Sequence, residues 1–189
     1  TSIPPHTSVH CRDSPASTRI SRSMAILWPP LQAHMRRDPG RRWTLLDLAT
    51  GAGDLPVALG LAAGRAGMQL ECHACDTSPT ALAHAQALAD DAGVQLHTFR
   101  CDLTREAIDR PYDFITCSLF LHHLRREQAV ALLASMQRSV RTCAVINDLN
   151  RCALGLALAW IGTRSLSRSP IVHADGPTSV RAAWTPDEV

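Results

Sequence analysis

Residues 45–54 combine an apolar run with two glycines, and this turn is the part of the sequence best suited to holding a ligand. They read Leu-Leu-Asp-Leu-Ala-Thr-Gly-Ala-Gly-Asp. Gly51 and Gly53 lack a Cβ atom, so they accept positive φ values and let a ligand lie against the backbone. Asp54 is placed to cap the following helix, and Pro56 is tolerated in its first turn. The pattern predicts a strand, a ligand-binding turn and a helix, although an ordinary strand-to-helix loop shares this signature.

Known phosphate-binding motifs fit this turn only in part. A dinucleotide site has the pattern G-x-G-x-x-G, and Pro56 occupies its third glycine position here. A Walker A loop ends in Gly-Lys-Ser or Gly-Lys-Thr, which this turn lacks. One possible function is therefore that of an NAD(P)-dependent oxidoreductase, although Pro56 at the third glycine position argues against it.

Carboxylates follow the next two expected strands, at positions that a parallel sheet brings to the same edge as the glycine turn. Asp76 follows the second strand, and Ser78 with Pro79 already forms a good N-cap and first residue for the next helix. Asp76 is therefore free to accept hydrogen bonds from ribose hydroxyls. Asp102 follows the third strand and could accept from an adenine amino group or cap residues 103–108.

Two adjacent histidines and one aspartate are the candidates for acid–base chemistry. His122 and His123 follow the fourth expected strand, and Asp148 follows the fifth. The pKa of a histidine lies near neutral pH, which suits a general base. The histidine pair could instead simply begin a helix. All three residues are candidate catalytic residues.

The cysteines do not form a recognisable metal or redox motif. There are seven, irregularly spaced. Cys72 and Cys75 match C-x-x-C, but they lie within an expected strand, whose alternation points them to opposite faces. A structural zinc site would need a second pair of ligands at similar spacing, and none is evident. The sequence predicts buried, reduced thiols and no metal site.

Apolar and alternating runs divide the chain into strands and helices. Strands are expected at residues 43–49, 68–75, 94–101, 112–118 and 142–147, and helices at residues 23–37, 55–66, 79–92, 126–138 and 153–166. This alternation predicts βαβ units and a mostly parallel sheet with helices on both faces. Residues 1–22, rich in Ser, Thr, Pro and Arg, are predicted to be a poorly ordered lead-in to one domain at residues 23–189.

Composition and charge exclude several classes of protein. Hydrophobic residues make up 46% of the 189 residues and charged residues 19%, which is typical of a globular domain. The net charge of +2 gives no reason to expect a nucleic-acid partner. No apolar run reaches 18 residues, and the N-terminus lacks the apolar core of a signal peptide. We therefore expect no membrane span and a cytoplasmic location.

The order of these motifs resembles that of the class I S-adenosylmethionine-dependent methyltransferases. The chain is similar to bacterial methyltransferases of the ubiquinone and menaquinone biosynthesis type, from about Trp43 to its end. The resemblance implies a Rossmann-like α/β sandwich, S-adenosyl-L-methionine as cofactor, and a small-molecule methyl acceptor. It further implies O- or C-methylation of a phenolic, quinone-like or polyketide-like acceptor.

The resemblance also implies a role for each matching residue. Asp47 would orient the turn and the methionine amino group, Asp76 would hold the ribose hydroxyls, and Asp102 would accept from the adenine amino group. Leu103 would lie against the adenine ring, and Ala49 stands where the family more often has glycine. The expected cofactor-binding residues are Asp47, Ala49, Gly51, Gly53, Asp76, Thr77, Asp102, Leu103, Ser118 and Leu119.

The strand count departs from the family pattern. The family fold has seven strands, whereas five are expected here, so the sequence predicts a C-terminally truncated domain whose last two strands are missing. Such a domain would expose a sheet edge. A non-catalytic remnant with a methyltransferase-like fold is therefore a further alternative, and measurable turnover would count against it. The oligomeric state is left open.

Overall fold

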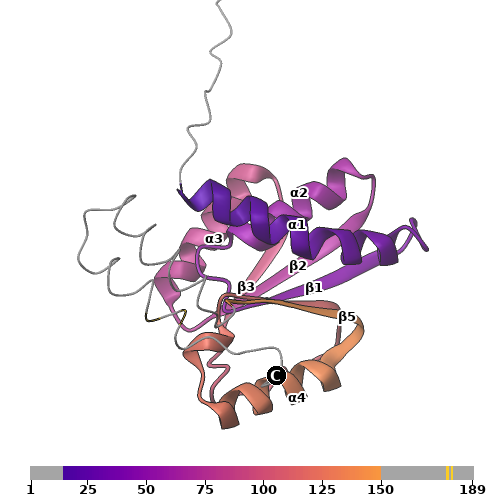
Figure 1. The fold of residues 1–189 in the computed structure, drawn as a ribbon. Helices are drawn as coiled ribbons and strands as arrows, with labels where there is room; N and C mark the ends of the chain where they lie inside the picture. Colours follow the sequence, from indigo (N-terminus) through magenta and orange to yellow (C-terminus); the bar gives the residue numbers. More distant parts are fainter. Residues whose placement is uncertain (1–14, 150–177, 179, 181–189) are drawn as a thin grey trace, which may run out of the picture.

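The computed structural model describes residues 15–149, 178 and 180, which contain a five-stranded sheet (Figure 1). The strands are β1 (Arg42–Leu48), β2 (Gln69–Asp76), β3 (Leu96–Arg100), β4 (Tyr112–Ser118) and β5 (Val140–Asn147). Their order is β3-β2-β1-β4-β5, and all neighbouring strands are parallel. The order reverses between β1 and β4, which is the switch point where open α/β sheets bind ligands. The predicted Rossmann-like fold is confirmed.

The central strands β1 and β4 are apolar on both faces. Leu45 and Leu46 of β1 pair with Phe114 and Ile115 of β4. These four side chains are at most 1% exposed. Strands buried on both faces are typical of a parallel sheet that is covered by helices, so β1 and β4 take the middle of the sheet.

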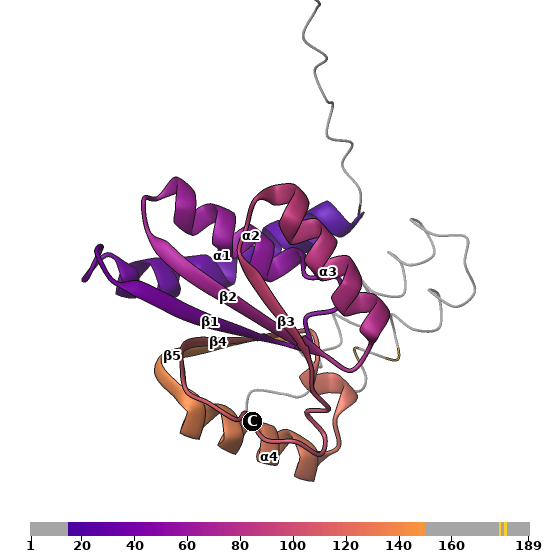
Figure 2. The same ribbon diagram turned by 180° about the vertical axis from the view of Figure 1, so that it is seen from behind.

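Helices cover the two faces unequally. They are α1 (Pro15–Met35), α2 (Asp54–Arg65), α3 (Pro79–Ala92) and α4 (Arg126–Ser139), with a short 3-10 helix η1 (Leu121–His123). Figure 1 shows α1, α2 and α3 on one face of the sheet and α4 on the other. Figure 2 shows the same layers from behind. The described part is thus a three-layer sandwich.

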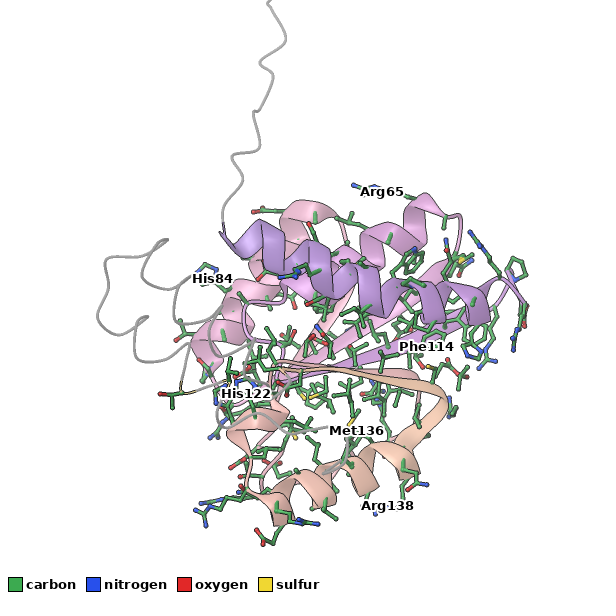
Figure 3. The ribbon with its side chains drawn as sticks, viewed as in Figure 1. Arg65, His84, Phe114, His122, Met136 and Arg138 are labelled. Carbon is green, nitrogen blue, oxygen red and sulfur yellow. The ribbon has the colours of Figure 1, made fainter. Side chains whose placement is uncertain are left out.

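Each face of the sheet has its own hydrophobic cluster. Phe114 belongs to the cluster under α1, α2 and α3, and Met136 belongs to the cluster under α4. Figure 3 shows these two side chains on opposite sides of the sheet. Cys72 lies in the first cluster and Cys75 in the second, which confirms that the C-x-x-C pair points to opposite faces.

The first helix begins earlier than predicted. It starts at Pro15 rather than Ser23, so the last part of segment 1–22 is helical, which corrects the predicted boundary. The helix also continues through Pro29 and Pro30. Each buried apolar side chain stabilises the folded protein by about 2 kcal/mol. This stabilisation offsets the loss of the backbone hydrogen bonds that the prolines cannot donate. The fully buried side chains of this helix are Leu27, Leu31 and Met35.

The remaining elements lie within two residues of their predicted bounds. Residues 103–105 form a turn and residues 106–108 have no regular secondary structure, so Asp102 does not cap a helix there. The predicted helix at residues 153–166 and the expected absence of the last two strands lie outside the described residues. In the described part of the chain, no helix is long and apolar enough to cross a membrane.

Candidate functional site

The turn after β1 contains backbone in the left-handed region. Ala49, Gly51 and Gly53 have φ values of 51°, 57° and 79°. This conformation costs a non-glycine residue such as Ala49 roughly 1–2 kcal/mol. Hydrogen bonds hold it in place: the Thr50 N–H donates to the Cys75 carbonyl at 3.0 Å, and the Gly53 N–H donates to the Thr50 carbonyl at 3.2 Å. The turn is therefore anchored to the end of β2.

The two glycines of this turn have different surroundings. A Cβ atom on Gly53 would lie 2.5 Å from the Cβ of Ala85, so Gly53 allows α3 to pack closely. A Cβ atom on Gly51 would meet nothing within 4 Å. Gly51 thus borders open space at the carboxyl end of the sheet, where a ligand can reach its backbone. Gly53 is also the N-cap of α2 without a side-chain cap, and Asp54 is the first helical residue, which corrects its predicted capping role.

Asp76 joins this turn to the next one. One of its carboxylate oxygens accepts from the Gly51 N–H at 2.9 Å, and the other accepts from the Ser78 N–H at 2.9 Å. Ser78 caps α3, as predicted, by accepting from the Ala81 N–H. The sequence predicted that Asp76 is free to bind a ligand, but both of its oxygens already accept hydrogen bonds. Each oxygen still has a lone pair that can accept a hydrogen bond from a hydroxyl group. Thr77 beside it is exposed.

Asp47 is a buried carboxylate beneath the turn. Its side chain is 2% exposed and accepts a 2.6 Å hydrogen bond from the Thr116 hydroxyl of β4. Burial raises the pKa of Asp47 from 3.8 to about 6, although the Thr116 hydrogen bond acts in the opposite direction. Thr116 stands opposite Asp47 in the register of β1 and β4. Sequence reasoning missed Thr116, because only the strand pairing brings it to Asp47.

Asp102 and Leu103 follow β3 and point in different directions. Asp102 accepts from the Thr104 N–H at 3.0 Å and from the Thr104 hydroxyl at 2.6 Å, and these bonds lower the pKa of Asp102. Leu103 is 7% exposed and belongs to the cluster under α4. It also lines a cavity of about 130 Å³ on that side. Asp102 thus organises its own loop, and Leu103 faces the core.

The end of β4 lies at the same carboxyl edge of the sheet as the glycine turn. Leu119 has φ 55° and is 37% exposed, and its N–H donates to the Asn147 carbonyl at 2.8 Å. The Asn147 amide donates to the Ser118 hydroxyl at 3.1 Å and to the Ser23 hydroxyl at 2.9 Å. Asn147 therefore ties β4, β5 and α1 together beside the glycine turn.

His122 and Asp148 form a pair across the ends of β4 and β5. The Nδ1 of His122 lies 2.6 Å from one Asp148 oxygen, and the His122 N–H donates to the other at 3.2 Å. Burial would raise the pKa of Asp148, but hydrogen bonds from His122 and the Leu149 N–H hold it below its usual value. His122 is 8% exposed and is labelled in Figure 3, whereas His123 is exposed. The structure joins two of the three candidate catalytic residues.

Comparison with protein families identifies the class of this chain. Residues 45–142, just over half of the chain, match the family described as a methyltransferase domain. The chain belongs to this family. The matched segment runs from β1 into β5 and includes the glycine turn, Asp76 and His122. No curated protein sequence matches the chain.

Solved structures share the fold. The plantazolicin methyltransferase BpumL in complex with SAH is 16% identical with a TM-score of 0.63, covering 93% of this chain and 67% of its own. Magnesium protoporphyrin IX methyltransferase from Synechocystis PCC 6803 with bound SAH is 17% identical with a TM-score of 0.63, covering 93% and 73%. An S-adenosylmethionine-dependent methyltransferase from Clostridium acetobutylicum ATCC 824 is 16% identical with a TM-score of 0.56, covering 76% and 62%.

These comparisons confirm the predicted class of enzyme, a methyltransferase with a Rossmann-like fold. The family match favours it over the NAD(P)-dependent oxidoreductase. Similarity to the quinone-biosynthesis type in particular stays a prediction, as do the roles of the individual site residues.

Proposed function

We propose that this chain binds S-adenosylmethionine at the carboxyl edge of β1 and β2 and transfers its methyl group to a small molecule. The observation that carries the proposal is the environment of Gly51. Open space lies where its Cβ atom would be, and its N–H donates a hydrogen bond to Asp76. Three of the similar structures are named as SAH complexes or as S-adenosylmethionine-dependent enzymes. Their shared fold supports the same ligand here.

The residues at this edge fit such a cofactor. Gly51 leaves its backbone uncovered by a side chain, and Asp76 provides acceptors for ribose hydroxyls. Asp47 is a buried negative charge, and no ion pair of the described residues includes it. A cationic amino group near the turn would therefore be stabilised electrostatically. Asp102, with Ser118 and Leu119, would border the rest of the ligand, whereas Leu103 faces the core.

The chemistry requires mainly alignment. The cofactor supplies a methyl group on a positively charged sulfur, which is reactive toward a well-placed nucleophile. The protein positions the acceptor and keeps water away from the edge. Asp148 holds Nδ1 of His122, so Nε2 is the nitrogen at which a proton from the acceptor could be taken up. We propose this role for His122, with Asp148 as its positioning residue.

The acceptor is proposed to be a small molecule. BpumL is named for plantazolicin and the Synechocystis enzyme for magnesium protoporphyrin IX. For this chain we propose O- or C-methylation of a phenolic, quinone-like or polyketide-like compound, as the family resemblance implies. A phenolic acceptor would make direct use of a base at His122.

Binding of S-adenosylhomocysteine tests the site by calorimetry. Wild-type protein should bind, and Gly51→Val should weaken binding at least about tenfold, because its side chain fills the space beside the turn. Gly67→Val is the matched control. Gly67 also has a positive φ (69°) and open space for a Cβ, but it lies beyond the other end of α2. Both variants carry similar backbone strain.

A second pair of variants tests the carboxylate. Asp76→Ala should also weaken binding at least about tenfold, whereas Asp91→Ala, at an exposed position of α3, should not. Affinity unchanged in Gly51→Val and Asp76→Ala would sink the site assignment. Absence of turnover with a panel of phenolic acceptors, despite tight binding, would favour the non-catalytic alternative.

A further inference from the structure

A cluster of metal-ligating side chains lies away from the cofactor edge, within the strands β2 and β3. Glu71 and His73 are two residues apart on β2, so both point to the same face of the sheet. His97 of β3 stands opposite His73 in the strand register. Cys75, two residues after His73, belongs to the cluster under α4, so this is the α4 face. Asp76 of the cofactor edge lies three residues from His73, or roughly 10 Å along the strand.

The ligand atoms of this cluster converge. Nε2 of His73 lies 2.9 Å from an oxygen of Glu71, and Nε2 of His97 lies 4.0 Å from the same oxygen. One ligand atom from each of the three residues can be chosen so that all lie within 4.8 Å of one another. The two imidazole rings stack with centroids 4.8 Å apart. Small side-chain movements would bring all three ligand atoms within bonding distance of one metal ion.

We propose that Glu71, His73 and His97 bind a zinc-like divalent cation, with a fourth position open to solvent or to a small ligand. Two imidazoles and one carboxylate are a ligand set that suits zinc, with bonds of about 2.0–2.2 Å. Three protein ligands leave one position of a tetrahedral ion free. The ion would replace the hydrogen bond between His73 and Glu71 and would link the edge strand β3 to β2.

A cavity beside the cluster leaves room for the fourth ligand. It measures about 280 Å³, and Glu71 and His73 form part of its wall. Arg110 and Arg141 also line it, so an anion or a water molecule at the open position would meet positive charge. His97 is 48% exposed on its side chain, which leaves a route for the ion from solvent.

Arg110 competes with the cation at His73, and Arg42, 3.9 Å from an oxygen of Glu71, competes at that carboxylate. Nη2 of Arg110 lies 2.8 Å from Nδ1 and 3.2 Å from Nε2 of His73, and its Nε donates to the Tyr112 hydroxyl at 2.8 Å. A guanidinium at this distance repels a bound cation. Arg110 must therefore turn into the cavity when the ion binds. The structure thus predicts opposite effects from removing Arg110 and from removing a ligand.

The experiment is a titration of EDTA-treated, full-length protein with zinc sulfate, followed by calorimetry and by the melting temperature. Wild-type protein should bind one equivalent at this site and melt at a higher temperature with zinc. His97→Ala and Glu71→Gln should each weaken zinc binding at least about tenfold, whereas Arg110→Met should strengthen it. Cobalt(II) in place of zinc should give the visible absorption of a tetrahedral ion.

The control is His84→Ala. His84 is an exposed histidine of α3 and points away from the sheet in Figure 3. This variant should bind zinc as the wild type does. No zinc binding by the wild type, or equal binding by wild type and a folded His97→Ala variant, would overturn the proposal. S-adenosylhomocysteine binding should be unchanged in His97→Ala, so failure of this site is distinguishable from failure of the cofactor site.

This proposal departs from the sequence prediction of no metal site. That prediction relied on closely spaced ligand pairs, and Cys72 and Cys75 are indeed on opposite faces. The available signal was the pattern Glu71-x-His73, which places two ligands on one face of a strand. The third ligand, His97, becomes visible only with the pairing of β2 and β3.

Discussion

Two aspartates at opposite ends of the sheet are equally buried but differently paired. Asp47, near the carboxyl end of β1, and Asp113, near the amino end of β4, are each 2% exposed. Asp113 accepts from the Thr44 N–H at 2.9 Å and from the Thr44 hydroxyl at 3.0 Å, and it forms an ion pair with Arg41. Asp47 accepts from the Thr116 hydroxyl and forms no ion pair with any of the described residues.

The difference shows that the two ends of the sheet have different roles, one in stability and one in ligand binding. At the amino end, Asp113 is neutralised by its own chain and contributes to stability. At the carboxyl end, the Asp47 carboxylate lies beside backbone at positive φ with no ion-pair partner in the described part of the chain, and burial raises its pKa to about 6. Perturbed carboxylates and unusual backbone conformations cluster at functional sites, because ligand binding relieves part of their cost. The carboxyl end is therefore arranged for a ligand.

The largest effect is expected for the turn at the carboxyl end. Gly53→Ala places a Cβ atom 2.5 Å from that of Ala85 and a non-glycine residue at φ 79°. We expect the free energy of unfolding to fall by roughly 3–5 kcal/mol. Gly93→Ala, at φ 66° with open space around it, should cost only about 1 kcal/mol. Urea unfolding measures both, and equal losses would contradict the close packing of this turn on α3.

An intermediate effect is expected from pH at Asp47. Its pKa is about 6 in the folded protein against 3.8 ordinarily, so the folded state favours the protonated form. This contribution to stability is fully present below pH 3.8 and is lost as the pH rises through 6. The whole shift corresponds to about 3 kcal/mol, and part of it is already lost at pH 4, so Asp47→Asn should gain roughly 2–2.5 kcal/mol relative to wild type between pH 4 and pH 7.5.

Urea unfolding across this pH range measures the effect. Saturating S-adenosylhomocysteine, which carries an amino group, should reduce the pH dependence of the wild type but not of Asp47→Asn. A stability difference between the two proteins that does not change with pH would contradict an uncompensated charge at Asp47.

The smallest effect is expected at the amino end. Asp113→Asn keeps the shape of the side chain but removes the charge that pairs with Arg41. Because the Arg41 side chain is 42% exposed, we expect a loss of only about 1–2 kcal/mol in the free energy of unfolding. Affinity for S-adenosylhomocysteine should stay the same. A matched Asp91→Asn variant on the surface of α3 controls for the change in net charge. Weaker binding of S-adenosylhomocysteine by Asp113→Asn would contradict the inference that the amino end contributes to stability alone.

Local patterns predicted most elements but not their contacts. The five strands and the helices α2, α3 and α4 were placed within two residues, because hydrophobic periodicity and the Ser78 cap are short-range signals. The start of α1 at Pro15 was missed, because residues 15–22 are rich in Ser, Arg and Thr and show no apolar periodicity. Local patterns did not show that Leu103 belongs to the cluster under α4, because the direction of a loop side chain depends on the elements around it, and its expected contact with adenine stays a prediction.

The sequence by itself determined the alternation of strands and helices, the glycine turn, and the acidic residues at the end of β2 and just after β3. These features follow from backbone preferences and burial within a few residues. Only the tertiary structure decided which side chains meet: Thr116 with Asp47, Asp148 with His122, and His97 with Glu71 and His73. Each of these contacts joins different strands or their ends, and strand order and register are set by burial over the whole sheet. The same register gives buried Asp113 an ion pair, whereas none of the described residues forms an ion pair with Asp47.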